Sequence, residues 1–300
     1  MLPLSRMKVL AIIHGSRKIP AVHDRFLAAC KEDPTLEFTQ SHTTQGGHAT
    51  TLAREAKGRV ELLILHGGDG LINEVVNGLC AKTGLNPKVF ILPGGTGNDF
   101  IRNFKRSDLL TTTPFELFQQ QGSQIQVPFC QSELDIRYFI NIADVGFGGH
   151  VVQSLNRFRA TLGVKASYFL SVIRTFISYK AQELSLSFNN YAHTQRYFMV
   201  AICHGSTFGN GMIIAPGKDP KLPQFRLVIL GDVSLWDYLK NLPKLKRGIE
   251  ISHPEIHYEQ ATSVDIAAAK NLMLGETDGE FIQGKSFHLG FSDQIIQVIC

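Results

Sequence analysis

A turn with an aspartate between glycines follows a short apolar run, Leu62 to Leu65. The turn consists of Gly67, Gly68, Asp69 and Gly70. Glycines let backbone N–H groups approach a ligand closely. The helix expected from Leu71 onward adds N–H groups and a partial positive charge at its first turn, which suits a phosphate. Because the Asp69 carboxylate would repel a phosphate unless a divalent cation lay between them, the turn predicts phosphate together with magnesium.

A second turn of the same kind follows the apolar run Val89 to Leu92. Its residues are Pro93, Gly94, Gly95, Thr96, Gly97, Asn98 and Asp99. If both runs are parallel strands of one sheet, the two turns face one crevice at the carboxyl ends of those strands. Neither turn has the Gly-Lys-Ser/Thr ending of a Walker loop or the spacing of a dinucleotide fingerprint.

Together the two turns resemble the lipid kinases of the diacylglycerol kinase and sphingosine kinase superfamily, in its soluble bacterial branch. That family carries G-G-D-G-T-x-N-E-V and P-x-G-T-x-N-D-[FL]. Residues 67–75 here read G-G-D-G-L-I-N-E-V, and residues 93–100 read P-G-G-T-G-N-D-F. The resemblance implies an ATP-dependent kinase that transfers the γ-phosphoryl group to the hydroxyl of a lipid alcohol, with diacylglycerol or a related lipid as the expected acceptor.

The same resemblance implies roles for individual residues. The nucleotide phosphates are expected at Gly67, Gly68, Gly70, Gly95, Thr96 and Gly97. Mg²⁺ is expected at Asp69, with support from Asp99, while ribose, phosphate or water ligands are expected at Asn73, Glu74 and Asn98. A late D-G-E element matches the family's place for the general base. There Asp278 would take the proton of the lipid hydroxyl, and Glu280 would orient Asp278 or contact the nucleotide.

Two further segments resemble family elements less closely. Gly15 and Ser16 follow the expected first strand, Lys8 to Ile13, where the family has a nucleotide-binding turn. Thr44 and His48 lie where the family lines its pocket. An ordinary turn between strand and helix is the alternative for the first pair, and a plain loop or helix-cap role is the alternative for the second.

Two departures from the family pattern keep other functions open. Leu71 stands where the family has a threonine, and residues 222–227 lack the acidic stretch that can hold a structural magnesium, with only Asp219 acidic nearby. We expect that second metal site to be absent or altered. One alternative is a relative of NAD kinase or phosphofructokinase, which shares the G-G-D-G turn. The other is a degenerate member that binds nucleotide or lipid without turnover.

The elements that position these residues form two patterns. Strands and helices alternate through Leu92, which predicts an α/β domain with a parallel sheet, similar to phosphofructokinase and NAD kinase. From Ile125 onward short strands dominate and predict a mainly antiparallel β-sandwich. Tyr138–Ala143 and Arg196–Ile202 are each expected as one strand. We therefore assign domains to residues 1–123 and 124–292, with 293–300 a candidate to return to the first domain.

Two basic segments of the second domain have a possible role at membranes. Val151 to Lys180 has helical spacing and contains no acidic residue; its basic residues are Arg157, Arg159, Lys165, Arg174 and Lys180. A second cluster comprises Lys240, Lys244, Lys246 and Arg247. Each segment is either an ordinary solvated basic face or a surface for transient contact with an anionic membrane.

Composition excludes several other classes of protein. Apolar residues make up 44% and charged residues 19%, as in folded soluble proteins. Because the sequence shows neither a membrane-spanning run nor a secretion signal, we expect a cytoplasmic protein with peripheral membrane association. The five cysteines show no metal-type spacing and are expected to be reduced. A net charge of +4 does not call for a nucleic acid partner. A homodimer formed through an exposed strand edge stays open.

Overall fold

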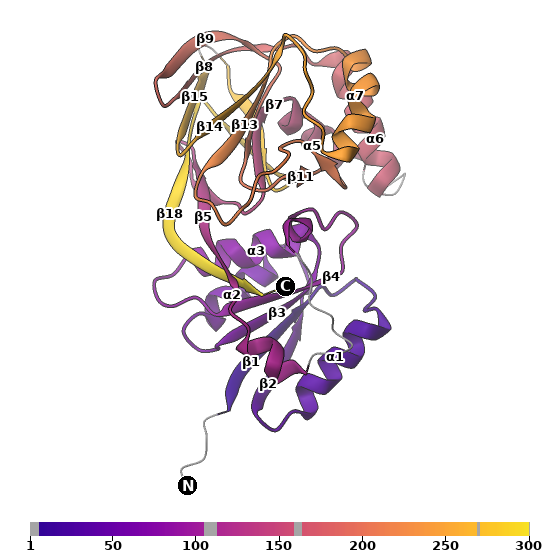
Figure 1. Ribbon diagram of the computed structural model, residues 1–300, viewed down its shortest axis with the longest axis vertical. Coiled ribbons are helices and arrows are strands. Elements are labelled where there is room, and N and C mark those ends of the chain that lie inside the picture. Colours follow the sequence, from indigo (N-terminus) through magenta and orange to yellow (C-terminus); the bar gives the residue numbers. More distant parts are fainter. Residues whose placement is uncertain (1–5, 105–112, 159–163, 269–270, 300) are drawn as a thin grey trace. The chain divides into compact units, whose positions relative to one another are not determined.

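The computed structural model describes residues 6–104, 113–158, 164–268 and 271–299 (Figure 1). The chain divides into two compact units. Unit 1 contains Met1–Val127 and Asp293–Cys300, and unit 2 contains Pro128–Ser292. Within the basic stretch from Val151 to Lys180, the side chains of Arg157, Arg159 and Lys165 lie outside the described residues.

Unit 1 alternates strands with helices. Its elements are β1 (Met7–Ile13), α1 (Ala21–Glu32), β2 (Leu36–His42), α2 (His48–Ala56), β3 (Leu62–Gly67), α3 (Asp69–Cys80), β4 (Lys88–Pro93), a 3₁₀ turn (Phe100–Asn103) and α4 (Pro114–Gln119). The four strands are parallel and lie in the order β2-β1-β3-β4. The N-terminal domain is therefore an α/β domain with a parallel sheet, as predicted.

Helices cover both faces of this sheet, so its central strands are buried on both sides. All six residues of β3 are buried, which explains the continuous apolar run in the sequence. On one face, Phe26 of α1 and Phe118 of α4 join a core with Ile64 of β3 and Phe90 of β4. Helices α2 and α3 lie together on the opposite face (Figure 1). Because the four strands are parallel, their carboxyl ends meet at one edge of the sheet.

Unit 2 consists mainly of short antiparallel strands. Its strands are β5 (Ser123–Gln131, which begins in unit 1), β6 (Ile136–Tyr138), β7 (Ile142–Gly146), β8 (Gln182–Phe188), β9 (Tyr191–Tyr197), β10 (Met199–Cys203), β11 (Thr207–Phe208), β12 (Met212–Ile213), β13 (Phe225–Leu230), β14 (Ile256–Ala261), β15 (Val264–Ala268), β16 (Met273–Thr277), β17 (Glu280–Gly284) and β18 (Ser286–Ile299). Its helices are α5 (Phe147–Phe158), α6 (Val164–Ser178) and α7 (Leu235–Arg247).

Two sheets of unit 2 pack face to face. One has six strands in the order β14-β13-β10-β7-β16-β17, and the other contains β18, β15, β8 and β9. Val200 and Leu227 of the first sheet share a buried core with Leu186 and Ile266 of the second. Helices cover the outer face of the six-stranded sheet. For example, Val151 of α5 belongs to a buried core that includes residues of this sheet. This arrangement confirms the predicted antiparallel β-sandwich.

Strand β18 takes part in both units. Its first half pairs with β15 antiparallel, with Val264 opposite Leu289. Its last residues pair with β4 in parallel, with Val298 opposite Val89. The final segment of the chain thus extends the parallel sheet of unit 1 by one strand.

Three expected elements differ in the structure. The strand expected at Tyr138–Ala143 is two strands, β6 and β7, because the intervening backbone bonds to other groups, described below. The strand expected at Arg196–Ile202 is interrupted at Phe198, whose N–H donates to Leu230 and whose carbonyl accepts from Phe147. The single helical stretch is two helices, α5 and α6. The first two interruptions depend on hydrogen bonds to partners that are remote in the sequence, which apolar periodicity does not reveal.

Candidate active site

The two glycine turns of unit 1 lie against each other. The Gly94 N–H donates to the Gly67 carbonyl at 2.7 Å. A Cβ atom added to Gly95 would lie 2.4 Å from the Gly68 Cα. Real Cβ atoms do not approach a backbone carbon this closely, so the contact requires glycine on both turns. The expectation that the two turns converge at the carboxyl edge of one sheet therefore agrees with the structure.

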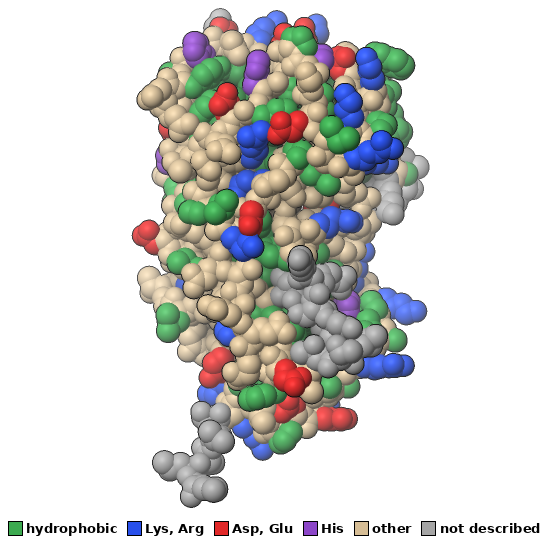
Figure 2. All heavy atoms as spheres, in the orientation of Figure 1, with side chains coloured by type: hydrophobic (Ala, Val, Ile, Leu, Met, Phe, Trp, Pro, Cys, Tyr) green, Lys and Arg blue, Asp and Glu red, His purple; other side chains and the backbone are tan. Residues whose placement is uncertain are grey.

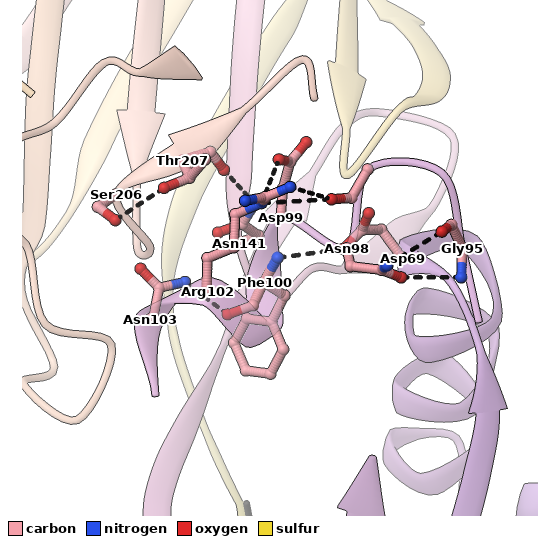
Figure 3. Close-up of polar contacts among 11 residues, drawn as sticks. Asp69, Gly95, Asn98, Asp99, Phe100, Arg102, Asn103, Asn141, Ser206 and Thr207 are labelled. Carbon is pink, nitrogen blue, oxygen red and sulfur yellow. Dashed lines mark hydrogen bonds and ion pairs between the residues drawn. The ribbon is translucent and has the colours of Figure 1, made fainter. Parts of the chain in front are cut away.

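Two carboxylates face the same glycine within this pair of turns. A Cβ atom on Gly97 would lie 3.2 Å from Oδ2 of both Asp69 and Asp99. The other oxygen of Asp69 accepts the Phe100 N–H at 3.0 Å, which fixes the orientation of the carboxylate (Figure 3). Asp99 is 7% exposed. Two carboxylate oxygens that converge in this way suit Mg²⁺, which takes oxygen ligands and commonly only one or two carboxylates from the protein.

Asn98 and Arg102 hold the second turn in shape. The Asn98 side chain accepts from the Gly95 N–H at 2.8 Å and donates to the Gly95 carbonyl at 3.0 Å. Its φ of 52° lies in the left-handed region, which asparagine tolerates. Arg102 donates to the Gly97 carbonyl at 3.0 Å and lies 3.6 Å from Asp99 (Figure 3). Arg102 was not among the predicted site residues, although its position three residues after Asp99 was the available signal.

The ends of β1 and β2 contribute further polar groups at the same edge. The Gly15 N–H donates to the Thr43 hydroxyl at 3.1 Å. Arg17, which follows β1, donates to the Thr96 hydroxyl at 3.4 Å. Thr44 is exposed, and both its N–H and its hydroxyl lie 3.1 Å from Nδ1 of His48. The exposed Ser16 lies next to Gly15. The polar residues that follow β1 and β2 therefore lie at the same sheet edge as the glycine turns.

The predicted polar residues of α3 bond to α2 and within α3 itself. The Glu74 carboxylate accepts the Ala49 N–H at 3.1 Å in the first turn of α2, and the Thr50 hydroxyl donates to the Glu74 carbonyl at 3.0 Å. Asn73 is buried and accepts from the Asn77 side chain. Leu71, at the position of the family's threonine, is buried with its side chain over Gly67. In this structure α3 thus supports the turn through packing.

In unit 2, Asp278 lies at the tip of a two-residue hairpin between β16 and β17. Thr277 pairs with Glu280, and the intervening Asp278 and Gly279 have φ values of 51° and 87°. Positive φ at both central residues defines a type I′ turn, for which Asp-Gly is a favoured sequence. Glu280 is exposed on β17, directly after the turn.

The Asp278 carboxylate is bound by three consecutive backbone N–H groups. Ile140 donates to one oxygen at 2.8 Å, and Asn141 and Ile142 donate to the other at 2.9 and 3.1 Å. The Asp278 N–H returns to the Ile142 carbonyl at 2.9 Å. Because these bonds use the backbone between β6 and β7, they account for the interruption of the strand expected there. They also fix both oxygens of the carboxylate.

His204 donates hydrogen bonds to the carbonyls of the same backbone segment. Its ring Nδ1 donates to the Ile140 carbonyl at 2.9 Å, and its backbone N–H donates to the Asn141 carbonyl at 2.9 Å. Burial, reinforced by the charge of Lys218, lowers the pKa of His204 to about 4. The imidazole is therefore neutral at physiological pH. No sequence signal separated His204 from any other buried histidine.

A buried pair of acids lies next to this hairpin. Asp144 of β7 and Glu276 of β16 are directly opposite in register, with exposures of 1% and 6%. Burial raises the pKa of Asp144 to about 7, and burial together with the Asp144 charge raises the pKa of Glu276. Glu276 also accepts the Gly279 N–H of the hairpin. Two acids this close in a dry site favour sharing a proton. The sequence did not indicate the pair, because the two residues are far apart in the chain.

Comparison with known protein families follows the division of the chain. The diacylglycerol kinase catalytic domain matches residues 8–128, and the YegS C-terminal NAD kinase beta sandwich-like domain matches residues 141–300. A diacylglycerol kinase of Bacillus subtilis is 28% identical over 253 residues, covering 83% of this chain and 81% of that protein. A diacylglycerol kinase of Staphylococcus haemolyticus is 27% identical, covering 80% of this chain and 71% of that protein.

Solved structures have the same fold over nearly the whole chain. The crystal structure of a diacylglycerol kinase from Bacillus anthracis aligns with a TM-score of 0.66 at 18% identity, covering 97% of this chain and 96% of that chain. An NAD kinase from Archaeoglobus fulgidus in complex with ATP aligns with a TM-score of 0.53 at 12% identity, covering 98% and 94%.

Fold and family matches together define a phosphotransferase of the kinase class. The chain belongs to the diacylglycerol kinase/YegS family of lipid kinases. Membership of this family implies ATP as the phosphoryl donor. Among the described residues, none of the helices is both long and apolar enough to cross a bilayer.

Proposed function

We propose that the chain is a magnesium-dependent kinase that transfers the γ-phosphoryl group of ATP to the hydroxyl of a lipid alcohol such as diacylglycerol. The main support is the convergence of the two glycine turns, with Asp69 and Asp99 both directed at Gly97. Backbone N–H groups and a pair of carboxylates at one sheet edge match the needs of a metal-bound triphosphate. The proposed acceptor is supported by relatives such as the diacylglycerol kinase of Bacillus subtilis.

In this proposal each group of residues has one task. The N–H groups of the two turns and the first turn of α3 bind the phosphates, with Thr96 as a hydroxyl donor. Gly15, Ser16 and Thr44 line the nucleotide side, and Asn98 keeps the second turn in shape. Asp69 and Asp99 would hold Mg²⁺. When bound, Mg·ATP supplies the transferable phosphoryl group and neutralises the charge that develops on it.

We assign Asp278 as the group that accepts the proton of the lipid hydroxyl. As the bond from the lipid oxygen to the γ-phosphorus forms and the bond to ADP breaks, this proton passes to the carboxylate. The three N–H donors fix the position of the Asp278 carboxylate. Because the transition state of phosphoryl transfer is loose, the proton leaves late, and a well-placed weak base is sufficient. Glu280, exposed beside the hairpin, would contact the nucleotide or orient Asp278.

A labelled-phosphate assay tests the proposal. The chain is incubated with γ-labelled ATP, Mg²⁺ and one acceptor at a time from a panel of lipid alcohols, NAD and fructose 6-phosphate. We expect label in the organic phase with a lipid alcohol, and none when Asp69→Ala replaces the wild type. Labelled NADP without labelled lipid would replace the proposal with an NAD kinase. ATP binding without transfer to any acceptor would instead identify a nucleotide-binding protein without turnover.

A further inference from the structure

The outward face of α6 carries three large apolar side chains, although the helix also packs apolar residues inward. Phe169, Leu170 and Ile177 are 51%, 41% and 77% exposed. On the inward side, Val172 is buried together with Ser171 and Thr175, with exposures of 4%, 0% and 3%. A surface helix normally turns its apolar side to the core and its polar side to water. Because α6 already packs apolar residues into the core, the exposed apolar side chains on its other side mean that water alone is not the environment for which this face is suited.

Helix α7 lies beside α6 and extends this apolar surface. The rings of Phe176 on α6 and Tyr238 on α7 have centroids 5.3 Å apart, and the two helices run side by side in Figure 1. Trp236 and Leu239 of α7 are 71% and 38% exposed. We call the exposed side chains of these two helices the α6/α7 surface. Its apolar members are Phe169, Leu170, Ile177, Trp236 and Leu239.

The charged residues of the α6/α7 surface are predominantly positive. Its exposed basic members are Arg174, Lys240, Lys244, Lys246 and Arg247. Helix α6 has no acidic residue in its sequence, and α7 has only Asp237. Asp237 already accepts the N–H and hydroxyl of Ser234 at 3.0 and 2.6 Å in a helix cap. Figure 2 shows hydrophobic and basic side chains next to one another over this region.

We infer that the α6/α7 surface docks onto an anionic lipid bilayer. An exposed tryptophan and aliphatic side chains beside flexible lysines are typical of a helix that lies in the membrane interface. Lysine and arginine then approach lipid phosphates, to which an anionic leaflet attracts them. The purpose of this docking rests on the proposed function. A lipid alcohol resides in a bilayer, and the enzyme must reach it there.

The chain contains a natural reporter for this docking, because Trp236 is its single tryptophan. Vesicles of phosphatidylcholine, with or without phosphatidylglycerol, are added to the full chain without ATP. We expect the tryptophan emission to shift to shorter wavelength and the protein to sediment with the anionic vesicles only. An unchanged emission together with protein left in the supernatant would overturn the inference.

Matched variants separate this surface from charge or hydrophobicity in general. Phe169→Ser with Ile177→Ser removes exposed apolar groups, and Lys244→Glu with Lys246→Glu reverses two charges. We expect each pair to weaken vesicle binding at least tenfold. The apolar control is Leu85→Ser, which replaces a residue 88% exposed in unit 1. The charge control is Arg25→Glu with Lys31→Glu on α1.

Several outcomes would contradict the inference. The controls could weaken vesicle binding as much as the surface variants. Alternatively, sedimentation velocity could show a dimer that Phe169→Ser with Ile177→Ser dissociates, which would identify the surface as a contact between copies. Because all substituted residues are exposed, unfolding curves are expected to match the wild type and are recorded for every variant.

The docking surface and the proposed activity can fail separately. If the activity is correct, the surface variants should phosphorylate a short-chain diacylglycerol dispersed in detergent at wild-type rates and lose at least fivefold on anionic vesicles. Equal rates on both substrates would contradict the docking surface while leaving the kinase intact. Absence of transfer to any lipid would contradict the kinase, whereas the emission of Trp236 would still test the docking.

Discussion

The chain holds its aspartates in two different ways. At the sheet edge of unit 1, Asp69 accepts one backbone N–H from Phe100, and its second oxygen is directed at Gly97 together with that of Asp99. In unit 2, Asp278 accepts three backbone N–H groups, which engage both of its oxygens. The first arrangement presents oxygens for a cation, and the second fixes a carboxylate in place. Residue type alone therefore does not define the role of a carboxylate.

The largest expected effect is that of Asp278→Asn. Asparagine tolerates the positive φ of this position but cannot act as a base, and its amide group faces N–H donors. We expect the turnover number to fall about 10²- to 10⁴-fold with ATP affinity unchanged. The free energy of unfolding should also fall by about 1–3 kcal/mol, since one donor loses its acceptor. Turnover and urea unfolding are measured on the same preparation. A stability loss with undiminished turnover would reduce Asp278 to a structural clamp.

Asp69→Ala should weaken activity through the metal instead. We expect about a 10²-fold loss of turnover, comparable to removing one group that stabilises transition-state charge. Unlike the Asp278 variant, this one should bind ATP more weakly in the presence of Mg²⁺ and unchanged in the presence of EDTA, as calorimetric titration can measure. Asp24→Ala, exposed on α1, is the control. The same Mg²⁺ dependence in the variant and the wild type would remove Asp69 from the metal site.

A third prediction concerns the backbone contact that brings the unit 1 carboxylates together. In Gly95→Ala the new Cβ would meet the Gly68 backbone, so the two turns must separate. We expect the free energy of unfolding to fall by about 1–3 kcal/mol, as for other overpacked sites, and ATP affinity to fall with it. Gly70→Ala is the stability control, because no atom of the described residues lies within 4 Å of a Cβ added there. Equal stability of the two variants would contradict the close approach.

A last prediction concerns the pH dependence of stability, through the buried acids beside the hairpin. Burial raises the pKa of Asp144 from 3.8 to about 7. Between these values the unfolded chain has lost the proton and the folded chain keeps it, so the contribution to stability falls as pH rises from about 4 to about 7. Thermal unfolding across this range should show a shallower decline for Asp144→Asn than for the wild type. Parallel profiles would mean that Asp144 does not hold this proton.

Much of the fold could be predicted because it depends on patterns local in sequence. The buried run Leu62–Leu65 and the alternation of strands with helices indicate a parallel sheet, and the short strands after Ile125 indicate the sandwich. Helix α7 was seen only as a basic cluster, although Ser234 and Asp237 form the capping box that begins it. Leu235, Leu239 and Leu242 recur at helical spacing, so this helix was within reach of the sequence. The interruption at Phe198 could not be predicted, because it depends on partners in other strands.

For the site, the sequence indicated the two turns and the D-G-E hairpin. It did not indicate what each polar group contacts: Glu74 caps α2, Arg102 binds the second turn, and His204 binds the segment before β7. The contacts of Glu74 and His204 join residues remote in the sequence, whose pairing has no local signature, whereas Arg102 lies only three residues after Asp99. The pair of Asp144 and Glu276 is a stronger example, since its raised pKa values follow from burial, which sequence spacing does not measure.

By itself the sequence determined the two glycine turns, the strands that lead into them and the Asp-Gly hairpin, because backbone conformational preference and hydrophobic periodicity act over a few residues. Only the tertiary structure decided which carboxylates face a common point and which are clamped by amides. It also decided that α6 exposes Phe169, Leu170 and Ile177. These properties depend on distance, burial and exposure, and such quantities arise only when remote segments of the chain pack together.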